Sequence, residues 1–175
     1  GENPLEAARL MFLGAFGFGE GIGFTLFYAT NFIFTGLAVA VAFHAGLFNI
    51  GGEGQALVGG LGAAIVALAL DAYVPWFLTF PFLVLGAALF GAAWAFIPAY
   101  LQATRGSHIV ITTIMFNFIG AALVTFILST VLRPDGTMEP ATRSFAEGAQ
   151  LPKMNFIMGL FGVNQGSAPF NISFL

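Results

Sequence analysis

The residues best suited to chemistry lie in one short interval, from Phe43 to Gln55, which reads FHAGLFNIGGEGQ. It places Asn49, Glu53, Gln55 and four glycines between two long apolar runs. Hydrocarbon leaves exposed backbone groups without partners, so a broken, glycine-rich segment between membrane spans must be surrounded by protein or water. In transporters such interruptions point to the binding region. We therefore expect these three side chains to line a pathway through a membrane.

A structural role for the same residues is the alternative. Asn49 can cap a helix that starts near Gly51, and Glu53 can sit at a wet interface near the positive end of that helix. The two interpretations are compatible, because a broken helix end beside a cavity is also what a gate needs.

Two further pairs of residues, each four positions apart, place an amide and a hydroxyl on one helix face: Asn31 with Thr35, and Thr113 with Asn117. Either pair could line the pathway. Alternatively, Thr in a membrane helix often bonds to its own preceding turn, and Asn often joins helices. Phe116 and Trp94 could stack on an aromatic ligand, although ordinary packing is the alternative in a chain with 22 Phe.

The two histidines, His44 and His108, both fall at the ends of predicted spans. They could hold a haem or a metal ion, but two His without nearby Cys or clustered carboxylates are a weak metal signal. The chain contains no Cys, which excludes thiolate chemistry and a disulfide framework. It also lacks a nucleotide-binding GK[ST] loop, so we expect no catalytic residue and no cofactor on this chain.

Composition indicates a membrane protein. The 175 residues are 58% hydrophobic and 7% charged, with a mean hydropathy of +0.92. Soluble domains carry roughly a quarter charged residues. A span needs about 20 apolar residues, and the gaps between charges predict spans at about 22–43, 55–70, 76–100 and 109–132. Five scattered basic residues make no nucleic-acid footprint.

The predicted fold is therefore an all-α, polytopic transmembrane bundle with a glycine-rich interruption, treated as one domain over residues 1–175. Residues 1–20 are expected to form an interfacial segment, with Asn3 as the helix cap and the glycines from Gly14 to Gly23 breaking the helix. Residues 133–153 read as an aqueous loop. Residues 154–175 read as a loop leading into a further span.

Small residues recur every four positions in two of the predicted spans, which lets helix backbones approach closely in lipid. The stripes are Gly59, Ala63 and Ala67 in one span, and Ala87, Gly91, Ala95 and Ala99 in the next. Tight packing between these spans is the expectation.

The run TGLAVAVAFHAGLFNIGGEGQ, from Thr35 to Gln55, closely resembles the membrane-spanning subunits of ATP-binding-cassette importers for branched-chain amino acids, ribose-type sugars and nucleosides. Its FNIG-x-EGQ form is most similar to the simple-sugar and nucleoside permeases. The segments NPLEA, ITTIMFNFI and LPK fit the same subgroup. The chain departs from the family at His44, where Arg is common, and at Ser107 and His108, where an Asn–Glu pair is common.

The resemblance implies that the chain is the N-terminal half of a longer permease, which forms the translocation pathway for a nucleoside or a simple sugar. The implied partners are ATP-binding subunits that carry the ATP, a periplasmic substrate-binding protein and a second permease subunit, in the bacterial inner membrane. It also implies that the loop 133–153 faces the periplasm and that 44–54 and 102–108 face the cytoplasm. The positive-inside rule favours the opposite orientation, because Arg133, Arg143 and Lys153 lie in the first of these loops.

A chain that begins with Gly and stops within an unfinished architecture is interpreted as processed, trimmed or incomplete. The alternative function is that of a truncated, permease-like structural subunit in the membrane part of another complex.

Overall fold

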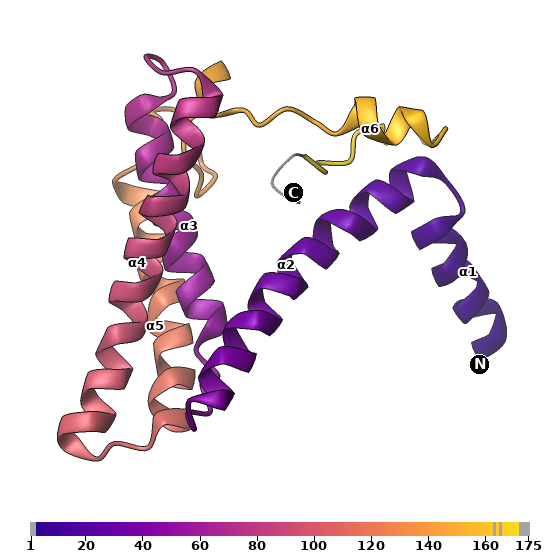
Figure 1. The fold of residues 1–175 in the computed structure, drawn as a ribbon. Coiled ribbons are helices and arrows are strands. Elements are labelled where there is room, and N and C mark those ends of the chain that lie inside the picture. Colours follow the sequence, from indigo (N-terminus) through magenta and orange to yellow (C-terminus); the bar gives the residue numbers. More distant parts are fainter. Residues whose placement is uncertain (1–2, 163, 165, 172–175) are drawn as a thin grey trace. The chain divides into compact units, whose positions relative to one another are not determined.

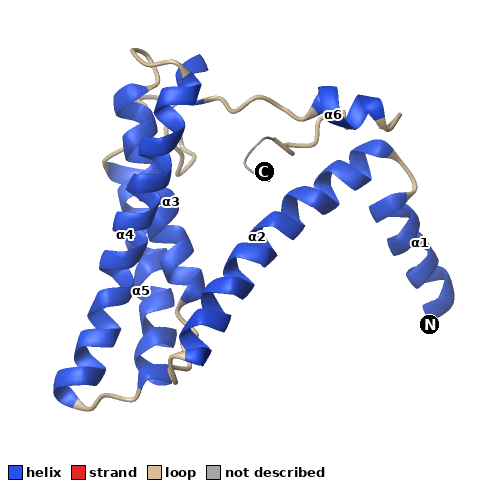
Figure 2. Cartoon of the chain, viewed as in Figure 1, coloured by secondary structure: helices blue, strands red, loops and turns tan. Residues whose placement is uncertain are grey.

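The computed structural model describes residues 3–162, 164 and 166–171 (Figure 1). Within these residues the regular elements are helices (Figure 2), and the one β-type contact is an isolated antiparallel bridge between Lys153 and Asn171. The prediction of an all-helical fold is confirmed. In chain order the elements are α1 (Pro4–Phe16), α2 (Gly19–His44), α3 (Gly52–Leu70), α4 (Trp76–Arg105), α5 (Ile109–Thr130), the 3-10 helix η1 (Glu147–Ala149) and α6 (Asn155–Leu160).

Four of these helices, α2 to α5, are long and apolar enough to cross a membrane. Their bounds lie within five residues of the predicted spans. Helices α2 and α3 begin three residues earlier, α2 ends one residue later, α4 continues past Tyr100 to Arg105, and α5 ends two residues earlier. Pro81 and Pro98 lie inside α4 and do not mark its ends. The helix stops at Gly106, whose positive φ of 65° is a left-handed conformation that favours glycine.

Contacts divide the chain into two compact units, residues 1–37 with 151–175 and residues 38–150. The boundary at residue 37 falls within α2. Because these units are defined by contacts alone, the single transmembrane domain over 1–175 stays a prediction.

In the first unit, the glycine-rich start differs from expectation. Asn3 caps α1 as predicted, with its Oδ1 accepting the Leu5 N–H at 3.1 Å. The helix break, however, is confined to the two residues between α1 and α2, and Gly19 and Gly21 are helical. A Cβ on Gly21 would lie 2.2 Å from the carbonyl oxygen of Gly14, so this glycine permits a close approach between the two helices instead of ending one.

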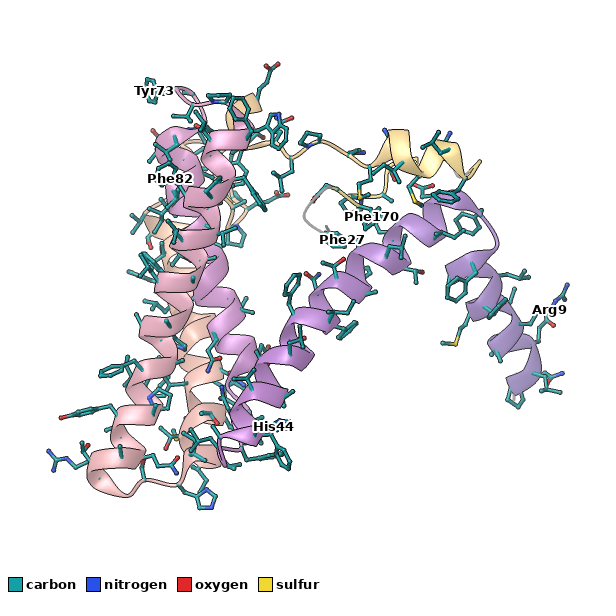
Figure 3. The ribbon with its side chains drawn as sticks, viewed as in Figure 1. Arg9, Phe27, His44, Tyr73, Phe82 and Phe170 are labelled. Carbon is teal, nitrogen blue, oxygen red and sulfur yellow. The ribbon has the colours of Figure 1, made fainter. Side chains whose placement is uncertain are left out.

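The segment from Lys153 to Asn171 folds onto the beginning of α2, within the same unit. Its backbone is closed by a hydrogen bond from Met154 N–H to Phe170 O at 3.3 Å. The apolar side chains of Met154, Met158 and Phe170 pack against Ile22, Leu26 and Phe27, and Phe27 and Phe170 are labelled in Figure 3. The Glu20 carboxylate accepts hydrogen bonds from the backbone N–H and the hydroxyl of Ser167. The predicted loop 154–175 thus contains α6, and the further span expected after it lies outside the described residues.

In the second unit, α3 packs most closely along α4 and also contacts α5. A Cβ on Gly59 would lie 3.1 Å from the Ala87 carbonyl oxygen, and a Cβ on Gly62 would lie 2.6 Å from that of Gly86. The predicted small-residue stripe is confirmed at Gly59 and Ala87. Gly62 and Gly86, which the stripe did not include, make the tighter contact.

Residues 133–150 return to the turn between α3 and α4, at one end of this unit. Gly148 N–H donates to the carbonyl oxygen of Asp71 at 3.2 Å. Gly148 is buried, and a Cβ there would lie 2.1 Å from the carbonyl oxygen of Val74. The loop is therefore held against the α3–α4 turn by close backbone packing.

Candidate functional site

The polar interruption lies between α2 and α3, and glycine ends the first of these helices. Gly46 has a φ of +75° and donates its N–H to Phe43 O at 3.0 Å, while Leu47 N–H reaches back to Ala42 O at 2.9 Å. This pattern of backward hydrogen bonds around a left-handed residue is typical of a helix C-terminus that ends on glycine. The chain then turns and enters α3 at Gly52.

Asn49 organises the turn before α3. Its Oδ1 accepts the Gly51 N–H at 2.8 Å, an Asx-type turn in which a side chain replaces a backbone acceptor. The N-cap position itself is occupied by Gly51, which provides no side-chain cap. Asn49 therefore lies two residues before the N-cap and does not occupy the cap position predicted for it; it shapes the entry into the helix instead.

Asn117, on α5, ties the break to the rest of the unit. Its Oδ1 accepts the Gly54 N–H at 2.9 Å, and its Nδ2 donates to Ile50 O at 2.9 Å. One side-chain amide thus satisfies a donor in the first turn of α3, which a helix start leaves without a helical partner, and the carbonyl of Ile50, which lies just before the helix. This is the helix-joining interpretation of Asn117.

A small cavity of about 120 Å³ lies where the start of α3, the end of α4 and the start of α5 meet. Its polar lining comes from Asn49, Gln55 and Thr113. The remaining lining is apolar: Ala42, Leu47, Ala95, Pro98, Ala99 and Ile109. Three of the predicted site residues therefore line the same cavity: Asn49 from the turn before α3, Gln55 from α3 and Thr113 from α5.

Within this cavity the three polar groups are not equally available. The Thr113 hydroxyl donates to Ile109 O at 2.8 Å on its own helix, and Thr113 is 1% exposed. The Asn49 oxygen already accepts from Gly51. Among the described residues, the Gln55 amide forms its hydrogen bonds with the Asn49 amide, two of 3.4 Å each. Gln55 is thus the least constrained of the three.

The other predicted site residues lie elsewhere. Glu53 is exposed in the first turn of α3. The Phe116 ring packs on Trp94, with ring centroids 5.3 Å apart, and the Trp94 Nε1–H donates to Phe116 O at 3.3 Å. Asn31 belongs to the first unit, where its side chain is exposed and its carbonyl accepts the Thr35 hydroxyl at 2.9 Å. Contact with a transported solute stays a prediction for all seven residues.

Sequence reasoning missed part of the lining. Ala95 and Ala99 were assigned to tight packing, yet both also border the cavity. The stripe of small residues continues along α4 to Ala99, beyond the part of α4 that packs on α3. This continuation could have indicated that Ala95 and Ala99 border a cavity. Two buried polar atoms near the same end of α4, Gln102 Oε1 and Ser107 Oγ, have no hydrogen-bond partner among the described residues.

The haem or metal hypothesis finds no cluster to build on. In the described part of the chain, no group of three or more His, Cys, Asp or Glu side chains is arranged as metal ligands would be. The His44 ring uses its Nδ1, which lies 2.8 Å from the Ala40 carbonyl oxygen on the same helix. A haem between His44 and His108 stays a prediction.

Four helices long and apolar enough to cross a membrane are the features of a multi-pass membrane protein. Comparison with protein families identifies the family of this membrane protein. Residues 21–164 match the family described as branched-chain amino acid transport system / permease component, and the chain belongs to this family.

Individual relatives extend the comparison. Over 119 residues, 68% of this chain, it is 44% identical to the guanosine ABC transporter permease protein NupP of Bacillus subtilis (strain 168). It is 38% identical over 81% of its length to the nucleoside ABC transporter permease protein NupB of Lactococcus lactis subsp. cremoris. It is also 33% identical over 87% of its length to the glucose ABC transporter permease protein TsgB13 of Haloferax volcanii.

These matches cover 34%, 39% and 40% of the three relatives. The chain thus spans about two fifths of the length of the relatives that it matches, or less. No solved structure matches the chain. The resemblance to simple-sugar and nucleoside permeases expected from the sequence is confirmed.

Proposed function

We propose that this chain is part of the permease subunit of an ATP-binding-cassette importer, and that it contributes to the translocation pathway of a nucleoside or a simple sugar. The relatives named for guanosine, nucleoside and glucose transport support this solute class. The observation in the chain itself that carries the proposal is the cavity at the break between α2 and α3, where Asn49, Gln55 and Thr113 add polar groups to an otherwise apolar lining. Polar side chains beside a broken helix are a feature of the solute sites of transporters.

The size of the cavity supports a shared pathway. A volume of about 120 Å³ corresponds to about four water molecules at ~30 Å³ each. Pockets that enclose a complete drug-sized ligand measure about 300–1,000 Å³. This cavity therefore receives one edge of a nucleoside or sugar, and the rest of the pathway comes from other parts of the full-length permease and from a second permease subunit.

The remaining partners follow from the same proposal. ATP is bound and hydrolysed by separate ATP-binding subunits, and a periplasmic substrate-binding protein delivers the solute. The assembly is placed in the bacterial inner membrane, with the loop 133–153 on the periplasmic side and the break at 45–51 on the cytoplasmic side. The family and its named relatives support these partners as a class.

Uptake by the complete importer tests the proposal. The full-length permease, its ATP-binding subunits and its binding protein are reconstituted in proteoliposomes and offered labelled guanosine, uridine, ribose, glucose and leucine. We expect ATP-dependent uptake of a nucleoside or a sugar and none of leucine. If the complete assembly accumulates none of these solutes, the structural-subunit alternative is favoured. If it accumulates leucine alone, the solute class is wrong.

Cysteine accessibility tests whether the cavity belongs to the pathway. The chain has no Cys, so a single introduced cysteine is a clean reporter once any cysteine outside these residues is replaced. We expect Gln55→Cys and Ala99→Cys to react with a charged thiol reagent and to be protected by the transported solute. Phe96→Cys, at a 65% exposed position on α4 outside the cavity lining, is the control expected to stay unreactive in lipid. Equal reactivity at all three positions would contradict a pathway here.

A further inference from the structure

Asn49 and Gln55 both line the cavity and contact each other as a pair of primary amides. Asn49 Nδ2 donates to Gln55 Oε1 and Gln55 Nε2 donates to Asn49 Oδ1, both at 3.4 Å. Each amide thus presents one donor and one acceptor to the other in a closed ring of two hydrogen bonds. Both distances lie beyond the usual N–H···O range of about 2.7–3.2 Å, so the pair is weakly formed.

The two members of the pair are held differently. Asn49 Oδ1 also accepts the Gly51 N–H at 2.8 Å, a normal hydrogen bond that fixes the Asn49 amide to the start of α3. The Gln55 amide has no shorter hydrogen bond among the described residues than its two contacts with Asn49. Releasing Gln55 therefore costs two long hydrogen bonds, while Asn49 keeps its orientation.

We propose that the Gln55 amide competes with the solute for the amide edge of Asn49, and that this edge binds the planar donor–acceptor edge of a nucleobase when Gln55 moves away. This inference rests on the proposed function and narrows its solute class to nucleosides. On guanosine, Asn49 Nδ2 donates to the base oxygen O6 and Asn49 Oδ1 accepts the N1–H. Side-chain amides bind base edges in this two-pronged way.

The chemistry of the lining favours a base over a sugar at this edge. A primary amide holds its donor and acceptor in one plane at a fixed spacing, as the amide of Gln55 and the lactam of guanine both do. A sugar hydroxyl rotates and imposes no plane. The neighbouring lining residues Ala95, Pro98 and Ala99 are apolar and small, which suits the flat face of a ring.

Asn49→Ser is the sharpest test, because the hydroxyl can still accept from Gly51 N–H but offers no planar donor–acceptor edge to a base. Uptake of guanosine is measured with the reconstituted full importer, in competition with guanosine carrying a methyl group at N1. In the wild type, methylation is expected to weaken competition about ten-fold or more, the discrimination typical of a good two-pronged base contact. In Asn49→Ser we expect KM for guanosine to rise by a similar factor and the effect of methylation to fall to about two-fold or less.

For Gln55→Met we expect the opposite change in KM. This second variant keeps the proposal testable if the first variant misfolds. Met has a similar volume and no amide, so the Asn49 edge is no longer occupied. KM for guanosine should fall, because the base no longer has to displace the Gln55 amide, whereas a purely structural role of the pair would impair both variants alike. Asn155→Ser, an amide-to-hydroxyl change at an exposed position on α6, is the matched control for Asn49→Ser and should leave KM unchanged.

The outcomes separate this inference from the proposed function. If the wild type imports guanosine and Asn49→Ser keeps its KM and its response to methylation, the base-edge contact is wrong and the permease function stands. A ten-fold rise in KM for Gln55→Met also overturns the inference, because Gln55 would then be a solute contact itself. An importer that moves sugars and no nucleoside overturns the inference alone. An importer that moves neither overturns both.

Discussion

Arg143 and Asp71, 72 positions apart in the chain, form a two-pronged ion pair. Arg143 Nη1 lies 2.8 Å from Asp71 Oδ2, and Nη2 lies 2.8 Å from Oδ1. Nη2 also donates to Leu68 O at 3.1 Å, and Ala146 N–H donates to Asp71 Oδ2 at 2.8 Å. The Asp71 side chain is fully buried, while 46% of the Arg143 side chain is exposed. Arg143 therefore holds the loop 133–150 against the C-terminal end of α3 through these bonds.

Arg143→Ala is expected to destabilise this junction, because it leaves a buried carboxylate without its cation. The thermal unfolding midpoint of the purified full-length permease should fall by several degrees. Arg143→Lys should recover only part of the loss, since an ammonium cannot bond both carboxylate oxygens in one plane. Arg133→Ala, an exposed arginine in the same loop, is the control. Equal midpoints for Arg143→Ala and Arg133→Ala would show that the ion pair does not hold the loop.

The pH dependence of the junction follows from Asp71. The Arg143 guanidinium and then the Ala146 N–H lower the pKa of the Asp71 carboxyl from 3.8 to about 2. Between these values the unfolded chain binds a proton on Asp71 that the folded chain does not, so acid favours unfolding. The stabilisation is complete above about pH 4 and is lost as the pH falls towards 2. Unfolding midpoints of the wild type and Asp71→Asn should differ at pH 6 and converge near pH 2. A difference that stays constant over this range would contradict the depressed pKa.

Asn117→Ala is expected to weaken the start of α3. It removes both hydrogen bonds of the amide and leaves the N–H of buried Gly54 without its partner, a loss of about 1–3 kcal/mol in the free energy of unfolding. Asn31→Ala, at an exposed amide on α2, should cost less than about 0.5 kcal/mol. Denaturation of the full-length permease in mixed detergent measures both. A changed KM for solute with unchanged stability in Asn117→Ala would instead assign Asn117 to the pathway.

Gly62→Ala and Gly60→Ala make a matched pair on α3. A Cβ on Gly62 would lie 2.6 Å from the Gly86 carbonyl oxygen on α4, whereas a Cβ on Gly60 would meet nothing within 4 Å. Overpacking at Gly62 should destabilise the α3–α4 crossing by about 1–3 kcal/mol. Gly60→Ala should be neutral or stabilising by up to about 1 kcal/mol. The same denaturation assay applies, and similar losses for both variants would show that the crossing is looser than described.

Much of the fold could be predicted from the sequence because the membrane restricts the choices. Long apolar runs between charges must be helices in lipid, where every backbone group needs a partner within its own segment. The four spans were therefore placed to within a few residues. The glycine-rich start was predicted incorrectly, because a glycine that ends a helix and one that lets Gly14 approach Gly21 look the same in a sequence.

The sequence predicted which segment contains the candidate site, but it did not predict how the side chains of the site contact one another. Asn49 and Gln55 were marked because polar residues at a break between spans are costly in lipid. Their mutual amide contact depends on the turn at Gly51, and the helix-joining role of Asn117 depends on how α5 lies beside α3. Phe116 was predicted as a possible ligand contact, but its ring packs on the ring of Trp94, a neighbour on α4.

The sequence by itself determined that this chain crosses a membrane through helices, where those helices lie and which permease family it belongs to. These properties are local, since hydropathy, helix length and a motif of eight residues from Phe48 to Gln55 carry them. Only the tertiary structure decided which polar groups share the cavity and that Arg143 fastens onto Asp71. Such pairings join residues that are far apart in the chain, and their distances follow from helix packing, which residue order alone does not specify.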